Sequence, residues 1–186
     1  MKVVSKKQLR QVLKEERQLY LSKSTKKRLI YLFEKPLSYK IWKWQKVLRI
    51  CEYWQSQKGT IAHLFLHYYK RRLFNRGTKL NIEIYPGCFE KGLKIYHTGI
   101  IVNSHAQIGE NCQLHGQNCI GNNGNNDICP RIGNGLNLGI GACIIGDVQL
   151  GHDSVIGAGS IVNKSFPDKS VIIGVPGKLL NKNDKL

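Results

Sequence analysis

Aliphatic side chains recur at every sixth position through much of the second half of this chain. Counted in sixes from Ile108 to Val162, nine of ten positions hold Ile, Leu or Val, and six of these residues are followed directly by glycine. An α-helix repeats every 3.6 residues and an ordinary strand every two, so neither element explains the period. A six-residue period is typical of a parallel β-helix, in which short strands carry inward aliphatic side chains and glycine permits the corners.

The tenth position of the repeat is Asn126, which lies in an Asn- and Gly-rich stretch from Gly121 to Asp127. Such a stretch favours turns and supplies no inward aliphatic side chain. Ile120 and Ile132 are twelve residues apart, so the repeat keeps its phase across the interruption. We therefore expect residues 121–131 to form a loop extruded from the β-helix, and loops on a regular scaffold often bind ligands.

The first 80 residues have a different composition. They hold only two of the 19 glycines but 12 of the 16 aromatic residues. Apolar residues at three- and four-residue spacing predict helices over 6–33, 37–57 and 61–75, and Pro36 suits the boundary between the first two. The predicted fold class is α+β, with a helical domain over 1–80 and a β-helix of hexapeptide repeats with a C-terminal cap over 81–186.

The net charge of +17 lies entirely in the helical part. Residues 1–80 contain 21 basic and 4 acidic side chains, whereas residues 81–186 contain eight of each. A charge of this sign favours an anionic partner, either nucleic acid or an anionic membrane surface. No recognised nucleic-acid-binding motif is present, so nucleic acid is not expected as a partner, and a nucleic-acid-binding protein is kept as the non-enzyme alternative.

Aromatic residues accompany this charge, with all three tryptophans (Trp42, Trp44, Trp54) in one predicted helix. Aromatic residues beside cations are typical of helices at a membrane surface. The alternative is that the aromatic residues pack the helical domain while the lysines face water. The sequence shows neither a signal peptide nor an apolar run long enough to span a bilayer, so we expect a cytoplasmic protein, or one peripheral to the inner face of the cytoplasmic membrane.

The cysteine and histidine pattern does not predict a metal site. The six cysteines include no C-x-x-C pair, which favours reduced thiols used as small apolar side chains. His63 and His67 lie four residues apart on a predicted helix without an evident third ligand, so helix packing is the favoured interpretation.

Three features together resemble the left-handed β-helix acyltransferases: the hexapeptide repeats, the extruded loop and the ending Phe166–Lys178, which reads FPDKSVIIGVPGK. The stretch EIYPGCFEKGLKIYHTG, from Glu83 to Gly99, looks most like the serine acetyltransferase branch. The resemblance covers about residues 82–180. It implies a left-handed coil, a homotrimer or a dimer of trimers, and acetyl-CoA as the acyl donor.

The resemblance also implies catalytic residues. His97 matches the family's catalytic histidine, and a histidine suits the removal of a proton from an attacking hydroxyl at neutral pH. Glu83 stands where the family usually has Asp, the carboxylate that orients the imidazole. A backbone N–H near Gly139 or Gly141 is expected to stabilise the oxyanion.

Departures from the family pattern bear on the acceptor. Serine acetyltransferases hold their amino acid with an acidic residue before the catalytic histidine and an Arg-His pair in the loop, and this chain has Tyr96, Ile128 and Cys129 at those positions. The loss of an arginine that would clamp an α-carboxylate favours a different acceptor. The resemblance then points to acetyltransferases that modify a sugar hydroxyl of a surface (capsular) polysaccharide or its lipid-linked precursor, with serine O-acetyltransferase as the alternative. The residues expected to bind the acceptor are Tyr96, Asp127, Cys129 and His115.

The same resemblance assigns a donor site to the glycine-rich coils and the terminal turn. The residues expected to bind acetyl-CoA are Gly139, Gly141, Ala158, Gly159, Gly174, Pro176 and Lys178, with Lys164 as a further phosphate contact. Corner geometry alone also explains these glycines. A zinc-dependent γ-type carbonic anhydrase on a similar β-helix is not favoured, because the β-helix half lacks the H-x₄-H histidine pair of that class.

Overall fold

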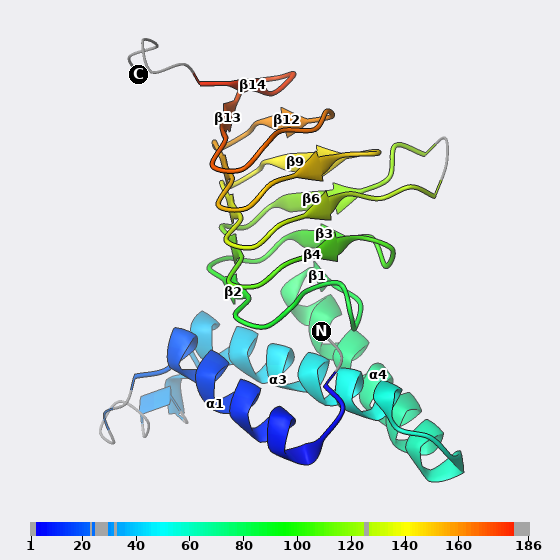
Figure 1. Cartoon of the computed structure of the whole chain (residues 1–186). Coiled ribbons are helices and arrows are strands. Elements are labelled where there is room, and N and C mark those ends of the chain that lie inside the picture. The colour runs from blue at the N-terminus through cyan, green and yellow to red at the C-terminus, as the bar shows by residue number, and fades with distance from the viewer. Residues whose placement is uncertain (1–2, 23, 25–29, 32, 125–126, 181–186) are drawn as a thin grey trace.

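The computed structural model describes residues 3–22, 24, 30–31, 33–124 and 127–180. Three helices, α1 (Lys6–Tyr20), α3 (Leu37–Ser56) and α4 (Thr60–Leu80), form a layer at one end of a tall prism of short strands (Figure 1). The first predicted helix is shorter than expected and ends at Tyr20, and residues 23, 25–29 and 32 of that prediction lie outside the described residues. The third is longer, because α4 continues through Gly77 to Leu80.

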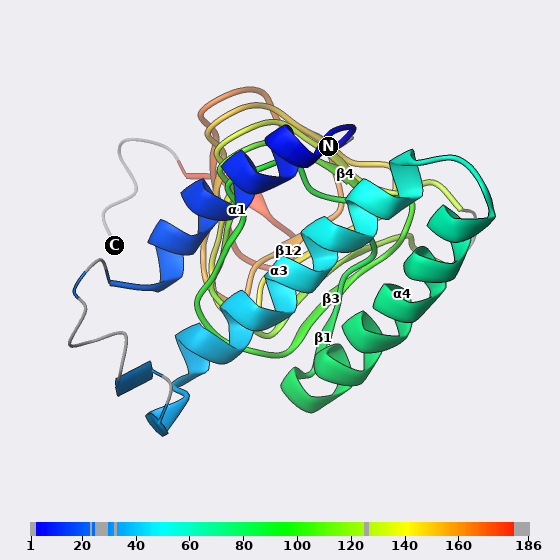
Figure 2. The ribbon, with the colours of Figure 1, turned by 90° about the horizontal axis from the view of Figure 1, so that it is seen from below.

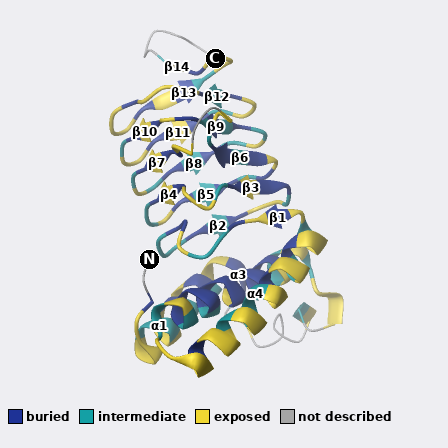
Figure 3. Cartoon of the chain, turned by 90° about the vertical axis from the view of Figure 1, so that its right-hand side faces the viewer, coloured by how far each residue is buried: buried dark blue, intermediate teal, exposed yellow. Residues whose placement is uncertain are grey.

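The strands form three sheets, which are the three faces of the prism (Figure 3). The five-stranded sheet, called sheet A here, contains β1 (Ile82–Glu83), β3 (Ile100–Val102), β6 (Asn118–Gly121), β9 (Cys143–Ile145) and β12 (Ile161–Val162). The three-stranded sheet B contains β4 (Gln107–Ile108), β7 (Arg131–Ile132) and β10 (Gln149–Leu150). The six-stranded sheet C contains β2 (Lys94–Ile95), β5 (Gln113–Leu114), β8 (Asn137–Leu138), β11 (Val155–Ile156), β13 (Val171–Ile173) and β14 (Lys178–Leu179).

Strand pairing explains the six-residue period. Leu138 pairs with Ile156 one coil further along, eighteen residues away, and the neighbouring strands of β1 to β13 pair in the same parallel way. Three hexads therefore make one coil, with one strand on each face. The aliphatic residue of each hexad points inward, and from Ile108 to Val162 the described members of the repeat are at most 6% exposed. The predicted parallel β-helix is confirmed, and its hand is left, as in the solved structures compared below.

The loop after β6 leaves the coil without disturbing this register. Ile120 pairs with Ile144, so the coil that contains the loop is one hexad longer than the next. Asn126, the residue that breaks the repeat, lies outside the described residues. At the far end β14 turns back to pair antiparallel with β13, which caps the β-helix.

The helical layer lies across the open end of the prism (Figure 2). Its central contact is Arg49 of α3, which is completely buried and forms ion pairs with Glu16 of α1 at 2.7 Å and with Glu52 of α3 at 2.9 Å. The same guanidinium donates to the backbone carbonyls of Phe89 and Glu90 in the first coil.

The two carboxylates complete this contact. Glu16 accepts a hydrogen bond from the backbone N–H of Gly92, and Glu52 accepts one from that of Gly87. Burial by itself lowers the pKa of Arg49, but Glu52 and Glu16 outweigh it and raise that pKa, so the guanidinium stays charged. The first coil of a parallel β-helix exposes backbone groups that have no strand partner on one side. Here charged side chains from two helices form hydrogen bonds with these groups.

A second buried contact uses neutral groups. Tyr20 donates its hydroxyl hydrogen to Gln45 and accepts from the backbone N–H of Ile95, while Gln45 donates to the carbonyl of Leu93. Trp42 and Trp44 are 5% and 1% exposed, so these two aromatic residues pack the helical domain, as the alternative interpretation expected. None of the helices in the described part of the chain has the length and hydropathy needed to cross a bilayer.

Replacing Arg49 by alanine is expected to destabilise the chain by about 3–5 kcal/mol, because Glu16 and Glu52 would remain buried without their cation. Lys46→Ala on the same helix is the matched control, since Lys46 is exposed and such changes alter stability by only about 0.5 kcal/mol. The measurement is the denaturant dependence of unfolding followed by circular dichroism. Equal stability of the two variants would contradict the role given to Arg49.

Candidate functional site

One edge of the prism gathers most of the residues that the sequence analysis singled out. It consists of the turns that lead from sheet C to sheet A, visible in Figure 3 between the β2–β5–β8 and β3–β6–β9 columns. We call this edge the His97 corner. Its turns comprise residues 96–99, 115–117, 139–142 and 157–160, and the turn that starts at Gly174 follows. The corner therefore brings together Tyr96, His97, His115, Gly139, Gly141, Ala158, Gly159 and Gly174.

Backbone contacts stack these turns on one another. Gly141 donates to the carbonyl of Gly116 at 2.9 Å, and Gly159 donates to that of Ile140 at 2.8 Å. Gly116 lies directly against His97, because a Cβ at Gly116 would be 2.7 Å from the His97 Cβ. A strip of small residues thus runs along the prism away from an exposed histidine.

The turn that carries His97 is one residue longer than its neighbour. Ile95 pairs with Leu114, and Val102 pairs with Ile120. Val102 therefore lies seven positions after Ile95, whereas Ile120 lies only six positions after Leu114. The extra residue lies between Ile95 and Ile100, where the chain forms the turn that contains His97. The regular repeat is therefore broken at the histidine, although the core register resumes at once.

Aromatic rings form a wall beside the histidine. Tyr96 stacks on His115 with a centroid distance of 4.7 Å and an interplanar angle of 14°. The Tyr96 hydroxyl donates to Gln113, and the His115 Nε2 lies 2.9 Å from the Asn137 Oδ1. His115 is thus hydrogen-bonded within the wall, and Tyr96 directly precedes His97 in the chain.

Asn118 is a positioning residue that the sequence analysis missed. It is 2% exposed, accepts from the backbone N–H of Gly116, and donates to the carbonyls of Gly139 and Ala142. It thereby holds the two turns above His97 in place. The sequence does carry a sign of this role. Asn118 is a polar residue at a strand position that faces the core, where the preceding coil has Ile100.

Glu83 does not contact His97 within the described residues of this single chain. Glu83 pairs in register with Ile101 on the outward face of sheet A, and its carboxylate accepts a hydrogen bond from Tyr85 at 2.9 Å. This bond is the main cause of the raised pKa of Tyr85. The expected orienting contact is therefore absent here because the strand register directs Glu83 away from the turn, and its catalytic role stays a prediction.

The loop residues lie at another corner. Asp127 and Cys129 follow β6 and precede β7, so they belong to the edge between sheets A and B, a full strand away from the His97 corner. Cys129 is 6% exposed, and burial followed by the nearby Asp127 raises the pKa of its thiol. A buried thiol of raised pKa is a poor nucleophile at neutral pH. Within one chain these residues are not near His97.

The remaining donor-site residues lie in the terminal cap. Gly174 follows β13 and donates its backbone N–H to the Ser160 hydroxyl, which ties the cap to the last turn of the His97 corner. Pro176 and Lys178 follow in the cap, and both are exposed. Lys164 lies over the Phe166 ring, on a different edge.

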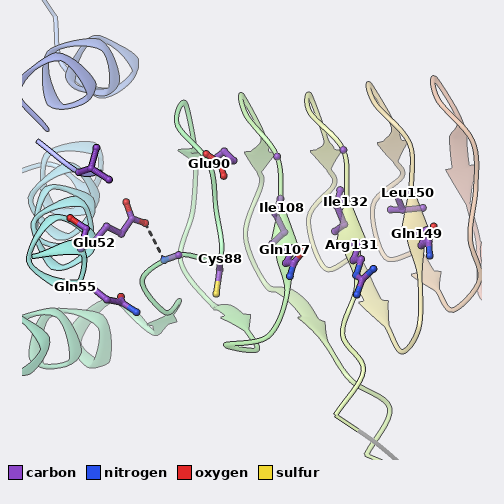
Figure 4. Close-up of a pocket in the computed structure, with 15 residues that line it drawn as sticks. Glu52, Gln55, Cys88, Glu90, Gln107, Ile108, Arg131, Ile132, Gln149 and Leu150 are labelled. Atoms are coloured by element: carbon purple, nitrogen blue, oxygen red, sulfur yellow. Dashed lines mark hydrogen bonds between the residues drawn. The ribbon is translucent and has the colours of Figure 1, made fainter. Parts of the chain in front are cut away.

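A groove of about 990 Å³ lies on sheet B, between the end of α3 and the outward faces of β4, β7 and β10 (Figure 4). Gln107, Arg131 and Gln149 line it on successive strands, and Glu52 lies at the end next to the helices (Figure 4). It does not include His97, so we do not assign it to the candidate site. The described residues also contain no cluster of three or more His, Cys, Asp or Glu side chains arranged to hold a metal ion.

Several curated proteins are similar to this chain in sequence. No protein-family model matches the chain. It is 35% identical over 157 residues to Serine acetyltransferase 4 of Arabidopsis thaliana, covering 75% of this chain and 42% of that protein. It is 28% identical over 107 residues to the serine acetyltransferase of Mycobacterium tuberculosis, covering 55% and 46%.

A third relative is the putative colanic acid biosynthesis acetyltransferase WcaB of Escherichia coli K12, 38% identical over 76 residues, covering 40% of this chain and 47% of that protein. The chain spans less than half the length of these curated relatives.

Solved structures give the same class. The soybean serine acetyltransferase complexed with serine superposes with a TM-score of 0.69 at 26% identity, covering 92% of this chain and 69% of that one. The serine acetyltransferase from Brucella abortus gives a TM-score of 0.71 at 24% identity, covering 94% and 70%. The fold defines a left-handed β-helix of hexapeptide repeats with an N-terminal helical layer. Within that class, serine acetyltransferases are homologues of this chain.

Gly116→Ala is expected to displace His97, because the new methyl group would meet the His97 Cβ at 2.7 Å and because the φ of +113° at Gly116 is unfavourable for alanine. Gly141→Ala in the same corner is the control, since it also places alanine at a positive φ (+71°) but its nearest neighbouring atom lies 3.9 Å away. The readout is the His97 imidazole resonance, assigned with a His97→Ala sample. Equal shifts in both variants would show that Gly116 does not support the histidine.

Proposed function

We propose that this chain is an acetyl-CoA-dependent O-acetyltransferase in which His97 is the general base. The observation that carries the proposal is the exposed His97 at the start of a strip of stacked small residues. The relatives that match the chain, which are described as acetyltransferases, support it. His97 takes the proton of the acceptor hydroxyl as the oxygen attacks the thioester carbonyl. The carbon–sulfur bond then breaks, and the thiolate of CoA takes the proton back from the His97 imidazolium.

The strip along the His97 corner is the proposed place for the donor. A thioester lying beside Gly116, Gly139 and Gly141 would put its carbonyl near backbone N–H groups and its far end near the cap. Small residues leave the backbone accessible to a ligand. Lys178, exposed in the cap, is the proposed contact for a CoA phosphate.

The comparisons favour L-serine as the acceptor. Serine acetyltransferases of plants and bacteria predominate among the relatives, and the chain is 26% identical to a structure described as complexed with serine. On this ground the serine reaction has stronger support than a sugar reaction.

One observation on the chain itself favours a sugar hydroxyl instead. The positions that resemble the amino-acid clamp hold Tyr96, Ile128 and Cys129, and none of these side chains carries a charge suited to an α-carboxylate or an α-amino group. The stacked pair of Tyr96 and His115 offers a flat ring surface beside His97. The match to a putative colanic acid biosynthesis acetyltransferase also supports a hydroxyl on a surface polysaccharide or its lipid-linked precursor.

Assembly of several copies would complete the proposed site. The outward residues of sheet A include the apolar side chains of Ile101, Cys119, Cys143 and Ile161, and Ile101 is 52% exposed. An apolar column on one face is suited to contact with other copies. In a homotrimer, or a dimer of trimers, this contact would bring the loop of one copy, with Asp127 and Cys129, toward the His97 corner of another.

His97→Ala is expected to lower the rate of thioester consumption by about 10²–10⁴-fold, since the general base is lost. His63→Ala is the control, because His63 is exposed on α4, in the helical layer. The assay follows free CoA thiol in the presence of L-serine and of a panel of capsular or lipid-linked oligosaccharides. Full activity of His97→Ala with every acceptor would disprove the mechanism.

The acceptor is tested with L-serine and serinamide as a matched pair. A sugar acceptor predicts similar kcat/KM values for the two compounds, both well below that of an oligosaccharide, because this chain has no cation at the clamp position to hold the α-carboxylate. A preference for L-serine of about 10²-fold or more would instead indicate a carboxylate clamp and establish serine as the acceptor.

Ile101→Glu is expected to convert the oligomer to monomers and to remove activity, because it places a charge within the apolar column of sheet A. Val155→Glu is the control, since Val155 is 38% exposed on the outward face of sheet C. Molar mass is measured by light scattering after size exclusion. An unchanged mass for Ile101→Glu would place the contact between copies elsewhere.

A further inference from the structure

The surface of the helical layer carries two adjoining cationic depressions. One of about 1070 Å³ lies between α1 and α3 and is lined by Arg10, Lys14, Arg17, Lys43 and Lys46 among others. The second, of about 440 Å³, contains Lys35, Lys40, Lys43, Arg76 and Lys79. Lys43 and Tyr39 line both, so we treat them as one feature and call it the cationic groove. No Asp or Glu occurs among the described residues that line it.

The buried ion pairs explain why the groove is so strongly positive. Residues 1–80 contain four carboxylates, and two of them, Glu16 and Glu52, are buried against Arg49. Only Glu15 and Glu34 of this part of the sequence are left to offset the surface lysines and arginines. Among the described residues of the helical layer, every Lys and Arg except Arg49 is at least partly exposed, with few anions to compensate them.

The groove lies on the side of α3 away from the β-helix. Gln45, Arg49 and Glu52 contact the first coil, whereas Lys40 and Lys43 lie on the opposite side of the helix at 3.6 residues per turn. In Figure 2 this outer side of the helical layer faces the viewer. A flat partner could thus approach the groove without meeting the β-helix.

Aromatic and apolar side chains accompany the cations. Tyr31 and Tyr39 stack at 6.5 Å, and the Lys43 ammonium lies 5.7 Å from the Tyr39 ring centroid. The same segment exposes Ile30 and Phe33, which are 46% and 84% exposed. Cations with exposed apolar side chains match a bilayer interface, where the cations meet phosphates and the apolar groups enter the acyl boundary. A nucleic-acid duplex would use the cations but not an exposed isoleucine.

We propose that the cationic groove docks the protein on an anionic lipid bilayer, with phospholipid phosphates between α1 and α3 and Phe33 in the interface. The β-helix would then stand away from the membrane. The turn with His97 belongs to the coil next to the helical layer, so it would lie at the membrane-proximal end of the prism. Docking is measured without turnover and does not depend on the proposed function.

The experiment is co-sedimentation of the full chain with vesicles of two parts phosphatidylcholine and one part phosphatidylserine, compared with vesicles of phosphatidylcholine alone. Binding is expected only to the anionic vesicles, and it should weaken as salt is added. The test variant is Lys43→Glu with Lys46→Glu. The control is Lys58→Glu with Arg71→Glu, which makes the same change in net charge at exposed residues of the same domain that do not line the groove.

The groove variant is expected to lower the partition coefficient by about 30-fold or more, since each basic residue near the surface contributes about a fivefold factor. The control variant should lose markedly less. Equal losses in the two variants, or equal binding to neutral vesicles, would overturn the proposal. Circular dichroism of both variants shows that they are folded.

Phe33→Ser tests the apolar part independently of charge. Because Phe33 is 84% exposed, its replacement leaves the packing intact. We expect weaker binding at every salt concentration with an unchanged salt dependence. Unchanged binding would contradict a bilayer as the occupant. A single-stranded oligonucleotide that binds the wild type more tightly than the vesicles and displaces them would assign the groove to nucleic acid instead.

Discussion

The buried guanidinium of Arg49 is the contact on which the rest of the molecule depends. A parallel β-helix has an open first coil whose backbone groups have no strand partner. Here Arg49 and its two carboxylates bond the carbonyls of Phe89 and Glu90 and the N–H groups of Gly87 and Gly92. The helices therefore replace a missing coil. This explains how a strongly basic segment and a neutral one form a common core.

The core and the candidate site obey separate constraints. Inward residues such as Leu114 and Leu138 are fully buried and must repeat in register, whereas the turns between strands are free to differ. The chain uses this freedom twice: an extra residue in the turn of His97, and an extra hexad in the loop after β6. Both occur without a change in the stacking of the aliphatic residues. The stacked strands fix where each turn lies, and the residues of the turns carry the functional groups.

The β-helix and its corner residues were predictable because they follow from a local period. The hexads from Ile108 to Val162 predicted the strands, and the spacing of Ile120 and Ile132 predicted a loop that keeps the phase. The Arg49 contact was not predictable. It joins Glu16 and Arg49, 33 residues apart, and both look like ordinary surface residues of amphipathic helices.

The site was predictable only in part. The resemblance pointed to His97, and the fold then gathered the glycines around it, because turns three hexads apart must stack. The Glu83 contact did not appear, since strand register, which a motif does not encode, turns the carboxylate toward Tyr85. The tryptophans left two interpretations open, because burial and membrane contact demand similar residues. An aromatic residue is buried if it lies on the side of its helix that packs against the rest of the fold, and it can meet a membrane only if it lies on another side.

The number of stacked turns in the His97 corner also fixes the length of the site. Each coil adds the spacing of neighbouring strands, about 4.8 Å, so the four steps from the turn of His97 to that of Gly174 span about 19 Å. A ligand that reaches from the histidine to the cap must match this length. Inserting or deleting one coil of eighteen residues would lengthen or shorten this distance by the spacing of one strand, while the turn of His97 and the cap stay unchanged. The distance from His97 to the cap is thus set by the number of coils, and it can change without a change in the residues at either end.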